Sequence, residues 1–315
     1  MIFKKLGKSN LTVSKICFGS LTLGPLQKNM NIKSAGAIVR YAFEKGVNFI
    51  DTAELYQTYD IIRNALDSNS DREKIVISSK TYAYTKNLAV KAVEDARKSL
   101  NRDVIDIFML HEQESIHTLQ GHKEALEQLI EYKHSGIIKA VGVSTHHVAT
   151  LNGVLEDEFR NCIDVVHPIY NYKGFGIADG TIAQMTETLE KIHKQNIGIF
   201  SMKPFGGGNL LNNASECLNF VLDKPFIDSV AIGMSSIDEV DLNIEFLEKR
   251  TFDKINISEK YLHIDSWCTK CGNCVKNCSF DALKIENDAL IYNKEKCSLC
   301  GYCGAFCPQF ALKII

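Results

Sequence analysis

The stretch Gly46-Val47-Asn48-Phe49-Ile50-Asp51-Thr52-Ala53-Glu54-Leu55-Tyr56 passes from a short apolar run to polar and ionisable side chains. An apolar run of about four to eight residues with polar ends predicts a buried strand followed by a loop. Seven more runs of this kind alternate with helical patterns before residue 250. The eight predicted strands cover residues 15–19, 48–52, 74–79, 106–111, 140–144, 164–169, 198–202 and 229–233.

Amphipathic stretches with helical periodicity separate these strands, among them residues 87–100, 120–134, 181–195 and 237–249. Strands that alternate with helices indicate a parallel sheet, and eight such units in about 250 residues predict a closed (β/α)8 TIM barrel. A polar segment, residues 3–14, is predicted to form a hairpin ahead of the first barrel strand.

The composition fits a globular chain with a large core, because 45% of its 315 residues are hydrophobic and 23% are charged. The formal net charge is −2 and there is no basic run, so neither nucleic acid nor an anionic membrane is an expected partner. The first ten residues lack an apolar signal core, and no apolar run reaches membrane-spanning length. We therefore expect a cytoplasmic protein.

Ionisable side chains follow three successive predicted strands. Asp51 and Tyr56 follow the second strand, Lys80 the third and His111 ends the fourth. The carboxyl ends of barrel strands meet at one mouth, where barrel enzymes place their chemistry. Hydride delivery to a carbonyl builds an alkoxide, which a phenol can protonate. We predict Tyr56 as general acid/base, Lys80 as the cation that lowers its pKa, Asp51 as the partner of Lys80, and His111 as the group that orients the carbonyl.

These segments resemble the motifs of the aldo-keto reductase family. The similar stretches are residues 46–56, Ser79-Lys80 and residues 106–111, and Gly142-Val143-Ser144 and Tyr170-Asn171 follow in the same order. The resemblance covers about residues 1–250. It implies an oxidoreductase that reduces a carbonyl or oxidises an alcohol of a small molecule with NAD(H) or NADP(H).

The resemblance also implies a cofactor site across the barrel mouth, formed by Ser144, His167, Met202, Lys203, Phe205 and Asn243. His167 stands where the family usually has glutamine, and Met202 replaces the aromatic ring that stacks on the nicotinamide. Glu239 stands where members that prefer NADP have lysine or arginine. Because a 2′-phosphate calls for a cation, Glu239 predicts a preference for NAD(H) over NADP(H), or little discrimination between them.

Eight of the eleven cysteines lie in the last 48 residues, in two copies of one spacing that are 29 residues apart. The flanking segments repeat as well, since Ala282-Leu283-Lys284-Ile285 returns as Ala311-Leu312-Lys313-Ile314. In this spacing three thiolates of one copy and the fourth of the other bind one cubane. We predict one 4Fe-4S cluster on Cys268, Cys271, Cys274 and Cys307, and a second on Cys278, Cys297, Cys300 and Cys303.

Residues 268–315 resemble a bacterial two-cluster ferredoxin, a small α+β domain. Pro308 follows Cys307 as in that family, whereas Ser279 follows Cys278. Structural zinc sites and disulfides are the alternative interpretations of the cysteines. The predicted organisation is a barrel over residues 1–250, a linker over 251–267 and a cluster domain over 268–315.

The two predicted modules handle electrons differently, because cubanes pass single electrons while hydride transfer moves two together. A flavin can connect the two modes, so a bound flavin or a ferredoxin-like partner protein remains open. The leading interpretation is an iron-sulfur oxidoreductase of the aldo-keto reductase type. A redox-sensing nucleotide-binding protein with an inactive barrel is the alternative, and a plain electron carrier is a third possibility.

Overall fold

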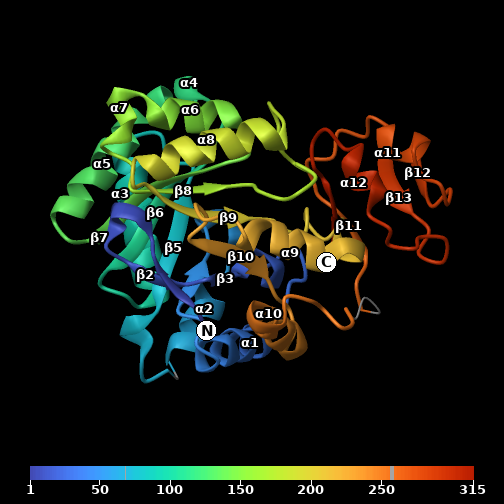
Figure 1. Cartoon of the computed structure of the whole chain (residues 1–315), viewed down its shortest axis with the longest axis horizontal. Coiled ribbons are helices and arrows are strands. Elements are labelled where there is room, and N and C mark those ends of the chain that lie inside the picture. Colours follow the sequence, from blue (N-terminus) through green and yellow to red (C-terminus); the bar gives the residue numbers. More distant parts are fainter. Residues whose placement is uncertain (68, 256–258) are drawn as a thin grey trace.

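The computed structural model describes residues 1–67, 69–255 and 259–315. Its main body is a closed barrel of eight parallel strands in which β10 pairs with β3 to complete the ring (Figure 1). All eight strands were predicted from the sequence, so the predicted TIM barrel is confirmed. The strands are β3 (Ile16–Gly19), β4 (Phe49–Asp51), β5 (Val76–Thr81), β6 (Ile105–Gln113), β7 (Ile138–Thr145), β8 (Val165–Pro168), β9 (Gly198–Met202) and β10 (Ser229–Gly233).

Helices form the outer layer, and polar side chains cap several of their N-termini. Thr85, Thr181 and Ser236 each accept a hydrogen bond from a backbone N–H in the first turn of the following helix. The predicted helix over residues 120–134 is divided at His122. The helices are α1 (Ile32–Glu44), α2 (Tyr59–Asp67), α3 (Lys86–Leu100), α4 (Ile116–Gly121), α5 (Lys123–His134), α6 (Val148–Leu155), α7 (Asp157–Arg160), α8 (Ile182–Lys194), α9 (Ala214–Leu222) and α10 (Ile237–Lys249).

The predicted N-terminal hairpin is present as β1 (Phe3–Lys5) and β2 (Thr12–Ser14), which pair antiparallel. Its connecting turn packs against the start of β9. A Cβ atom on Gly7 would lie 2.1 Å from the backbone nitrogen of Gly198, so only glycine fits there. The hairpin therefore covers the end of the barrel opposite the predicted active site.

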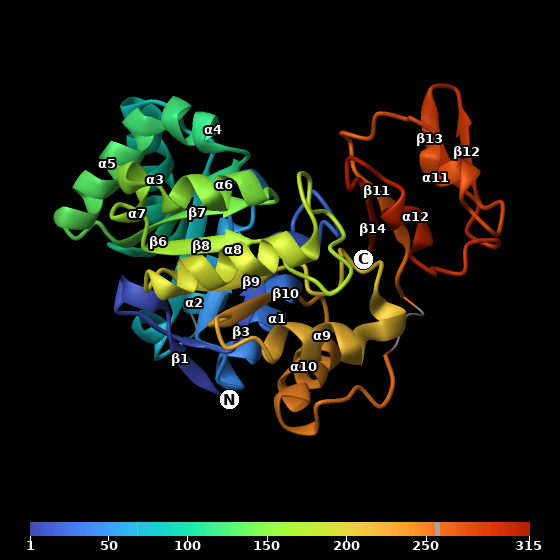
Figure 2. The same cartoon turned by 45° about the horizontal axis from the view of Figure 1, so that its top comes forward.

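The C-terminal region forms a separate lobe beside the barrel (Figure 2). Two small antiparallel sheets build it, β11 with β14 and β12 with β13. Leu262–Ile264 forms β11 within the segment predicted as linker. The other elements are α11 (Asn273–Lys276), β12 (Leu283–Glu286), β13 (Ala289–Tyr292), α12 (Tyr302–Ala305) and β14 (Leu312–Ile314).

The sequence repeat is also a structural repeat, because α11 and β12 return as α12 and β14 with the same offset of 29 residues. Gly272 and Gly301 precede the two helices, and both have φ +79°. Both copies therefore begin with the same left-handed turn, which glycine adopts without strain.

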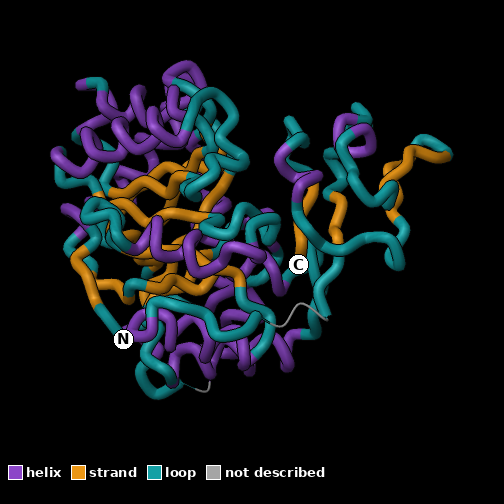
Figure 3. Tube along the Cα trace, turned by 45° about the vertical axis from the view of Figure 1, so that its right-hand side comes forward, coloured by secondary structure: helices purple, strands orange, loops and turns teal. Residues whose placement is uncertain are grey.

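Strand β14 docks on the loop that follows β9. Figure 3 shows the C-terminus between the barrel and the rest of the lobe. The N–H of Ile314 donates to the carbonyl of Gly207 at 2.9 Å, and the Asn209 side-chain amide donates to the carbonyl of Leu312 at 2.9 Å. A Cβ atom on Gly208 would lie 2.0 Å from the Ile314 carbonyl oxygen. The glycines of this loop therefore allow the C-terminal lobe to contact the barrel mouth.

Among the residues described, no helix combines the length and the apolar character needed to cross a membrane.

Candidate active site

The four predicted catalytic residues meet at the carboxyl end of the barrel. Asp51 is the last residue of β4, Lys80 lies in β5, His111 lies in β6, and Tyr56 lies in a helical turn after β4. The Lys80 Nζ lies 2.8 Å from Asp51 Oδ2 and 3.5 Å from the Tyr56 hydroxyl. The Tyr56 hydroxyl lies 3.4 Å from His111 Nε2. The sequence therefore identified a set of residues that share one hydrogen-bonded network.

The Asp51–Lys80 ion pair is buried, and the Lys80 side chain is fully enclosed. Burial alone would raise the pKa of Asp51, but the Lys80 ammonium and His167 outweigh it and hold that pKa well below its usual range. Lys80 also donates to the Thr52 carbonyl oxygen at 2.7 Å. The lysine is thus fixed under the Tyr56 ring, 4.6 Å from its centroid.

The proton state of Tyr56 differs from our expectation that Lys80 lowers its pKa. Burial raises the pKa of Tyr56 well above its usual value, and the negative charge of Asp51 adds to this. The reason lies in the distances, because Lys80 makes its shorter hydrogen bonds to Asp51 and Thr52. Burial likewise lowers the pKa of His111 to about 3. The site therefore holds a neutral phenol beside a neutral imidazole.

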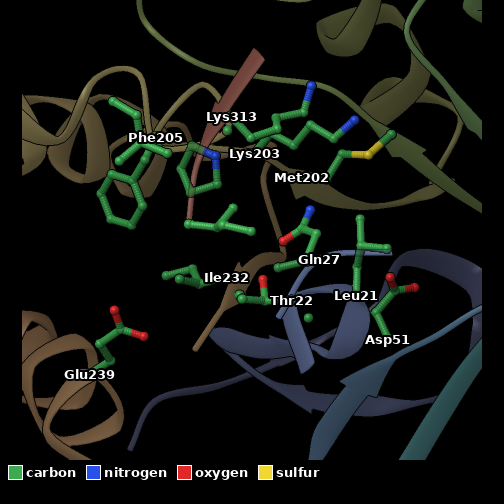
Figure 4. Close-up of a pocket in the computed structure, with 18 of the residues that line it drawn as sticks. Leu21, Thr22, Gln27, Asp51, Met202, Lys203, Phe205, Ile232, Glu239 and Lys313 are labelled. Atoms are coloured by element: carbon green, nitrogen blue, oxygen red, sulfur yellow. The ribbon is translucent and has the colours of Figure 1, made fainter. Parts of the chain in front are cut away.

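A groove across the barrel mouth has Tyr56 among its lining residues. Figure 4 shows Asp51 and Glu239 at different ends of this groove. Four of the predicted cofactor residues line it, namely His167, Met202, Lys203 and Phe205. His167 is also tied to the catalytic network, with Nε2 3.6 Å from Asp51 Oδ2 and Nδ1 2.7 Å from the Phe200 carbonyl oxygen.

The other two predicted cofactor residues are not among those that line the groove. The Ser144 hydroxyl accepts a hydrogen bond from the N–H of Glu112 at 2.8 Å. The Asn243 side-chain amide donates to the Glu239 carbonyl at 2.7 Å, while its Oδ1 is buried without a partner. The structure thus brings four of the six predicted cofactor residues to the groove.

A second cavity, of about 440 Å³, also has Tyr56 in its wall. Its barrel wall includes His111 and Tyr82, whose rings stack with centroids 4.5 Å apart. The rest of its wall comes from the C-terminal lobe. The lobe residues that line the cavity are Asp265, Trp267, Gln309, Phe310 and Lys313.

Sequence reasoning missed this shared wall. His146, His147 and Phe310 line the cavity but belong to none of the motifs described above. Lys313 lies in the repeated tetrapeptide, whose sequence does not place it at the barrel mouth. A wall built from two lobes leaves no local pattern, so the contacts between lobes were needed to find it.

Comparison with known proteins agrees with this geometry. Residues 15–216, well over half of the chain, match the Aldo/keto reductase family. The chain belongs to the aldo-keto reductase family. L-galactose dehydrogenase from Arabidopsis thaliana is 24% identical over 81% of this chain and 92% of its own length. The uncharacterized oxidoreductase YqkF from Bacillus subtilis is 29% identical over 82% of this chain and 95% of its own.

A solved structure supports the same fold. The holo form of aldo-keto reductase AKR11C1 from Bacillus halodurans aligns with a TM-score of 0.66 at 23% identity, covering 79% of this chain and 91% of that one. The family assignment makes the protein an oxidoreductase, in a family that uses NAD(P)H.

The far end of the groove in this aldo-keto reductase carries Glu239 beside two lysines. Glu239 accepts hydrogen bonds from the Ser235 N–H at 2.7 Å and from Lys260 Nζ at 2.6 Å. Lys28 Nζ donates to the Ser235 hydroxyl at 3.0 Å. The negative charge of Glu239 is therefore balanced by Lys260, which precedes β11 in the chain.

The eight clustered cysteines line two separate cavities in the C-terminal lobe. One is lined by Cys268, Cys271, Cys274 and Cys307, and the other by Cys278, Cys297, Cys300 and Cys303. Within the described ranges, no three or more His, Cys, Asp or Glu side chains are grouped to hold a single metal ion. All eleven cysteines of the chain are described, and each is a free thiol.

The surroundings of these thiols suit an iron-sulfur centre. The backbone N–H of Ala282 donates to Cys278 Sγ at 3.4 Å, and that of Ala311 donates to Cys307 Sγ at 3.2 Å. Such N–H···S contacts stabilise thiolates that bind iron. Burial, with the nearby Cys307 sulfur, raises the pKa of Cys274 to about 11. With this pKa the Cys274 side chain is a thiol at neutral pH, so it would bind iron as a thiolate only beside a cationic centre that displaces its proton.

Proposed function

We propose that this enzyme reduces the carbonyl group of a small molecule, or oxidises the corresponding alcohol, with a nicotinamide cofactor in the groove. The observation that carries the proposal is the position of Tyr56, which lines both the groove and the second cavity. A substrate carbonyl beside the Tyr56 hydroxyl would face a cofactor on one side and the cavity on the other. Family membership supports the same reaction class.

The proposed chemistry follows from the proton states of the site. A bound nicotinamide supplies the hydride. Tyr56, neutral because burial raises its pKa, donates its proton to the carbonyl oxygen as negative charge develops there. Lys80 then stabilises the phenolate that remains, since its ammonium lies 3.5 Å from the hydroxyl oxygen. His111 orients the carbonyl through Nε2, and Asp51 holds Lys80 in place through their ion pair.

The direct test is Tyr56→Phe, assayed with NADH and a panel of aldehydes. General acid catalysis contributes about 10²- to 10⁴-fold, so kcat should fall within this range. Tyr84→Phe is the matched control, because Tyr84 is 58% exposed and does not line either cavity. A Tyr56→Phe variant with wild-type turnover would remove Tyr56 from the mechanism.

We further propose two 4Fe-4S clusters in the C-terminal lobe, each held by the four cysteines that line one cavity. Support comes from the division of the cysteines into the two predicted sets and from the N–H···S contacts. A cubane is larger than one ion, so its ligands surround a volume and do not converge on a point, which favours it over zinc. When bound, such clusters transfer single electrons.

Iron and sulfide analysis of protein purified without oxygen tests the clusters. We expect about eight iron and eight sulfide per chain, since each cubane holds four of each. Cys274→Ser should lower both numbers by about half, whereas Cys162→Ser, outside the two sets, should leave them unchanged. Zinc without sulfide would contradict the proposal.

The cofactor preference is proposed to be NAD(H) over NADP(H), supported by Glu239 at the far end of the groove. Its pairing with Lys260 reduces the repulsion of a 2′-phosphate, so the preference should be small. A flavin that connects the clusters to the substrate is compatible with the second cavity. Anaerobic purification followed by an absorption spectrum of the released cofactor distinguishes nicotinamide from flavin.

A redox-sensing role is the second candidate, supported by Met202 in place of an aromatic ring and by the absence of Ser144 from the described groove lining. A sensor would bind NADH without turning over any aldehyde. Measured NADH binding with no turnover across the aldehyde panel would favour it.

A further inference from the structure

The second cavity contains two lysines that take no part in the proposed proton transfer, and one of them, Lys203, is also a predicted cofactor residue. Lys203 follows β9 in the barrel, and Lys313 lies in β14 of the C-terminal lobe. Both residues line the groove as well as the cavity, so they lie where a cofactor and a substrate would meet. Figure 4 shows the two side chains together near Met202. Two lysine side chains thus lie at the junction of the second cavity with the groove.

Lys203 has a neutral partner. Its Nζ lies 2.8 Å from His146 Nε2, and burial lowers the pKa of His146 well below its usual value, so the imidazole accepts the hydrogen bond. No acidic side chain among the described residues forms an ion pair with Lys203. Burial and the nearby Lys313 lower the pKa of Lys203 to about 7. The ammonium form of Lys203 therefore lacks a direct counter-ion.

Lys313 is held in place by contacts of its own lobe. Its Nζ lies 3.3 Å from Asp265, donates to the Phe310 carbonyl, and lies 3.7 Å from the centroid of the Phe310 ring. Lys203 Nζ lies 5.3 Å from the same centroid. The Phe310 ring therefore brings the two cations together, and Asp265 balances one of them.

None of the described acidic residues that line the cavity forms an ion pair with Lys203. Asp265 is already engaged by Lys313 and by His263, 3.1 Å away. Glu112 accepts a hydrogen bond from the Tyr82 hydroxyl, and Glu114 is exposed. Glu112 and Glu114 also bring negative charge to the cavity, but neither forms an ion pair with Lys203. A ligand carboxylate can take the place of this missing partner, and beside these acidic residues it is tolerated better than a phosphate, which carries nearly two negative charges.

We propose that Lys203 and Lys313 form a carboxylate subsite, so that the substrate is a carbonyl compound that also carries a carboxylate. This inference rests on the proposed carbonyl reduction. A carboxylate can accept hydrogen bonds from both ammonium groups, and charge-assisted bonds of this kind are strongest where water is excluded. The C-terminal lobe therefore contributes to substrate selection through Lys313.

The internal repeat supplies a matched control. Lys284 occupies the position in β12 that Lys313 occupies in β14, within the same Ala-Leu-Lys-Ile sequence. The Lys284 side chain is 63% exposed and pairs with Glu286, whereas the Lys313 side chain is 6% exposed. Lys284→Met changes the same residue in the same motif, but away from the cavity.

The test compares kcat/KM for succinic semialdehyde with kcat/KM for butanal, a neutral aldehyde of equal length. The wild-type enzyme should favour succinic semialdehyde. Lys313→Met should lower the ratio by about ten- to a hundredfold, the effect of one charge-assisted hydrogen bond. The double variant Lys313→Met/Asp265→Asn leaves no unpaired buried carboxylate, and it should lower the ratio by a similar factor. Lys313→Arg should largely retain the ratio, and Lys284→Met should not change it.

A binding measurement separates this inference from the proposed reaction. Succinate, which cannot be reduced, should bind the wild-type enzyme in calorimetry and bind the Lys313→Met variant about tenfold or more weakly. Reduction of butanal with no preference for succinic semialdehyde and no succinate binding would overturn the subsite and leave the reaction standing. Succinate binding without any aldehyde reduction would overturn the reaction and support the subsite.

Discussion

The barrel and the C-terminal lobe are stabilised in different ways. The barrel encloses a continuous apolar core that includes every one of its strands. The lobe has one small cluster of buried residues, with Leu262, Leu283, Leu290, Leu312 and Ile314 packed beside Cys274. A region of this size rarely buries enough apolar surface to fold on its own. The comparison indicates that the barrel folds through its core, while the lobe depends on docking and, if it binds them, on the two clusters that we propose for it.

Removal of iron should have the largest effect, and it should be confined to the lobe. Without cubanes the buried thiols lose the centres that hold the two cysteine sets together, so the lobe should unfold. Limited proteolysis followed by mass spectrometry should then show a stable barrel fragment and rapid cleavage after about residue 260. Equal protease resistance of the lobe with and without iron would contradict the difference between the two regions.

Docking should depend on Gly208. An alanine there would place its Cβ 2.0 Å from the Ile314 carbonyl oxygen, at a φ of +83° that favours glycine. Gly208→Ala should destabilise the docked lobe by about 1–3 kcal/mol. Hydrogen exchange of the Ile314 amide, which donates to Gly207, should accelerate accordingly. Gly121→Ala is the control, since a Cβ atom there meets nothing within 4 Å.

The barrel should lose stability in mild acid because it buries a neutral histidine. Burial lowers the pKa of His111 to about 3 in the folded protein, whereas the unfolded chain has the usual value of about 6.5. Between these values the unfolded state binds the extra proton, so the free energy of unfolding should fall as the pH drops from about 6.5 toward 3.

Urea unfolding followed by circular dichroism at pH 7.5 and pH 5.5 measures this effect on the barrel transition. His111→Gln should reduce the loss of stability between the two pH values. His134→Gln, at the exposed end of α5, should leave it unchanged. If the stability of the wild type and both variants falls equally with pH, His111 is not the cause of the pH dependence.

The smallest effect should come from the ion pair between Glu239 of α10 and Lys260 of the segment that joins the two regions. Glu239→Gln removes the negative charge near a 2′-phosphate, so NADPH should gain affinity relative to NADH by about three- to tenfold. Lys260→Met should shift the ratio in the opposite direction, because it leaves Glu239 without its partner. Fluorescence titration of each cofactor gives the ratio, and much tighter NADPH binding by the wild-type enzyme would overturn the NAD(H) preference.

The sequence predicted the barrel well because its signals are local. Short apolar runs with polar ends mark each strand, and strand ends place Asp51, Lys80 and His111 at one mouth. Residue spacing likewise divided the cysteines into the two sets that line the cavities. Each of these inferences depended on neighbours within a few residues or on one internal repeat.

The remaining features depend on contacts between distant segments. Strand β11 has only three residues and pairs with β14 at the other end of the lobe, so its sequence resembled a linker. The proton state of Tyr56 depends on how Lys80 divides its hydrogen bonds, which spacing does not reveal. The position of Lys313 depends on docking, because an identical tetrapeptide leaves Lys284 in solvent.

The repeated Ala-Leu-Lys-Ile tetrapeptide has an evolutionary consequence. Duplicated segments begin with equal freedom to change, but here one copy lies against the barrel mouth and the other faces solvent. Mutational drift should therefore be asymmetric, with most substitutions tolerated at Lys284 and few at Lys313. A library of random substitutions at both codons can be selected for reduction of succinic semialdehyde. The number of residue types tolerated at each position would measure how differently docking constrains the two copies.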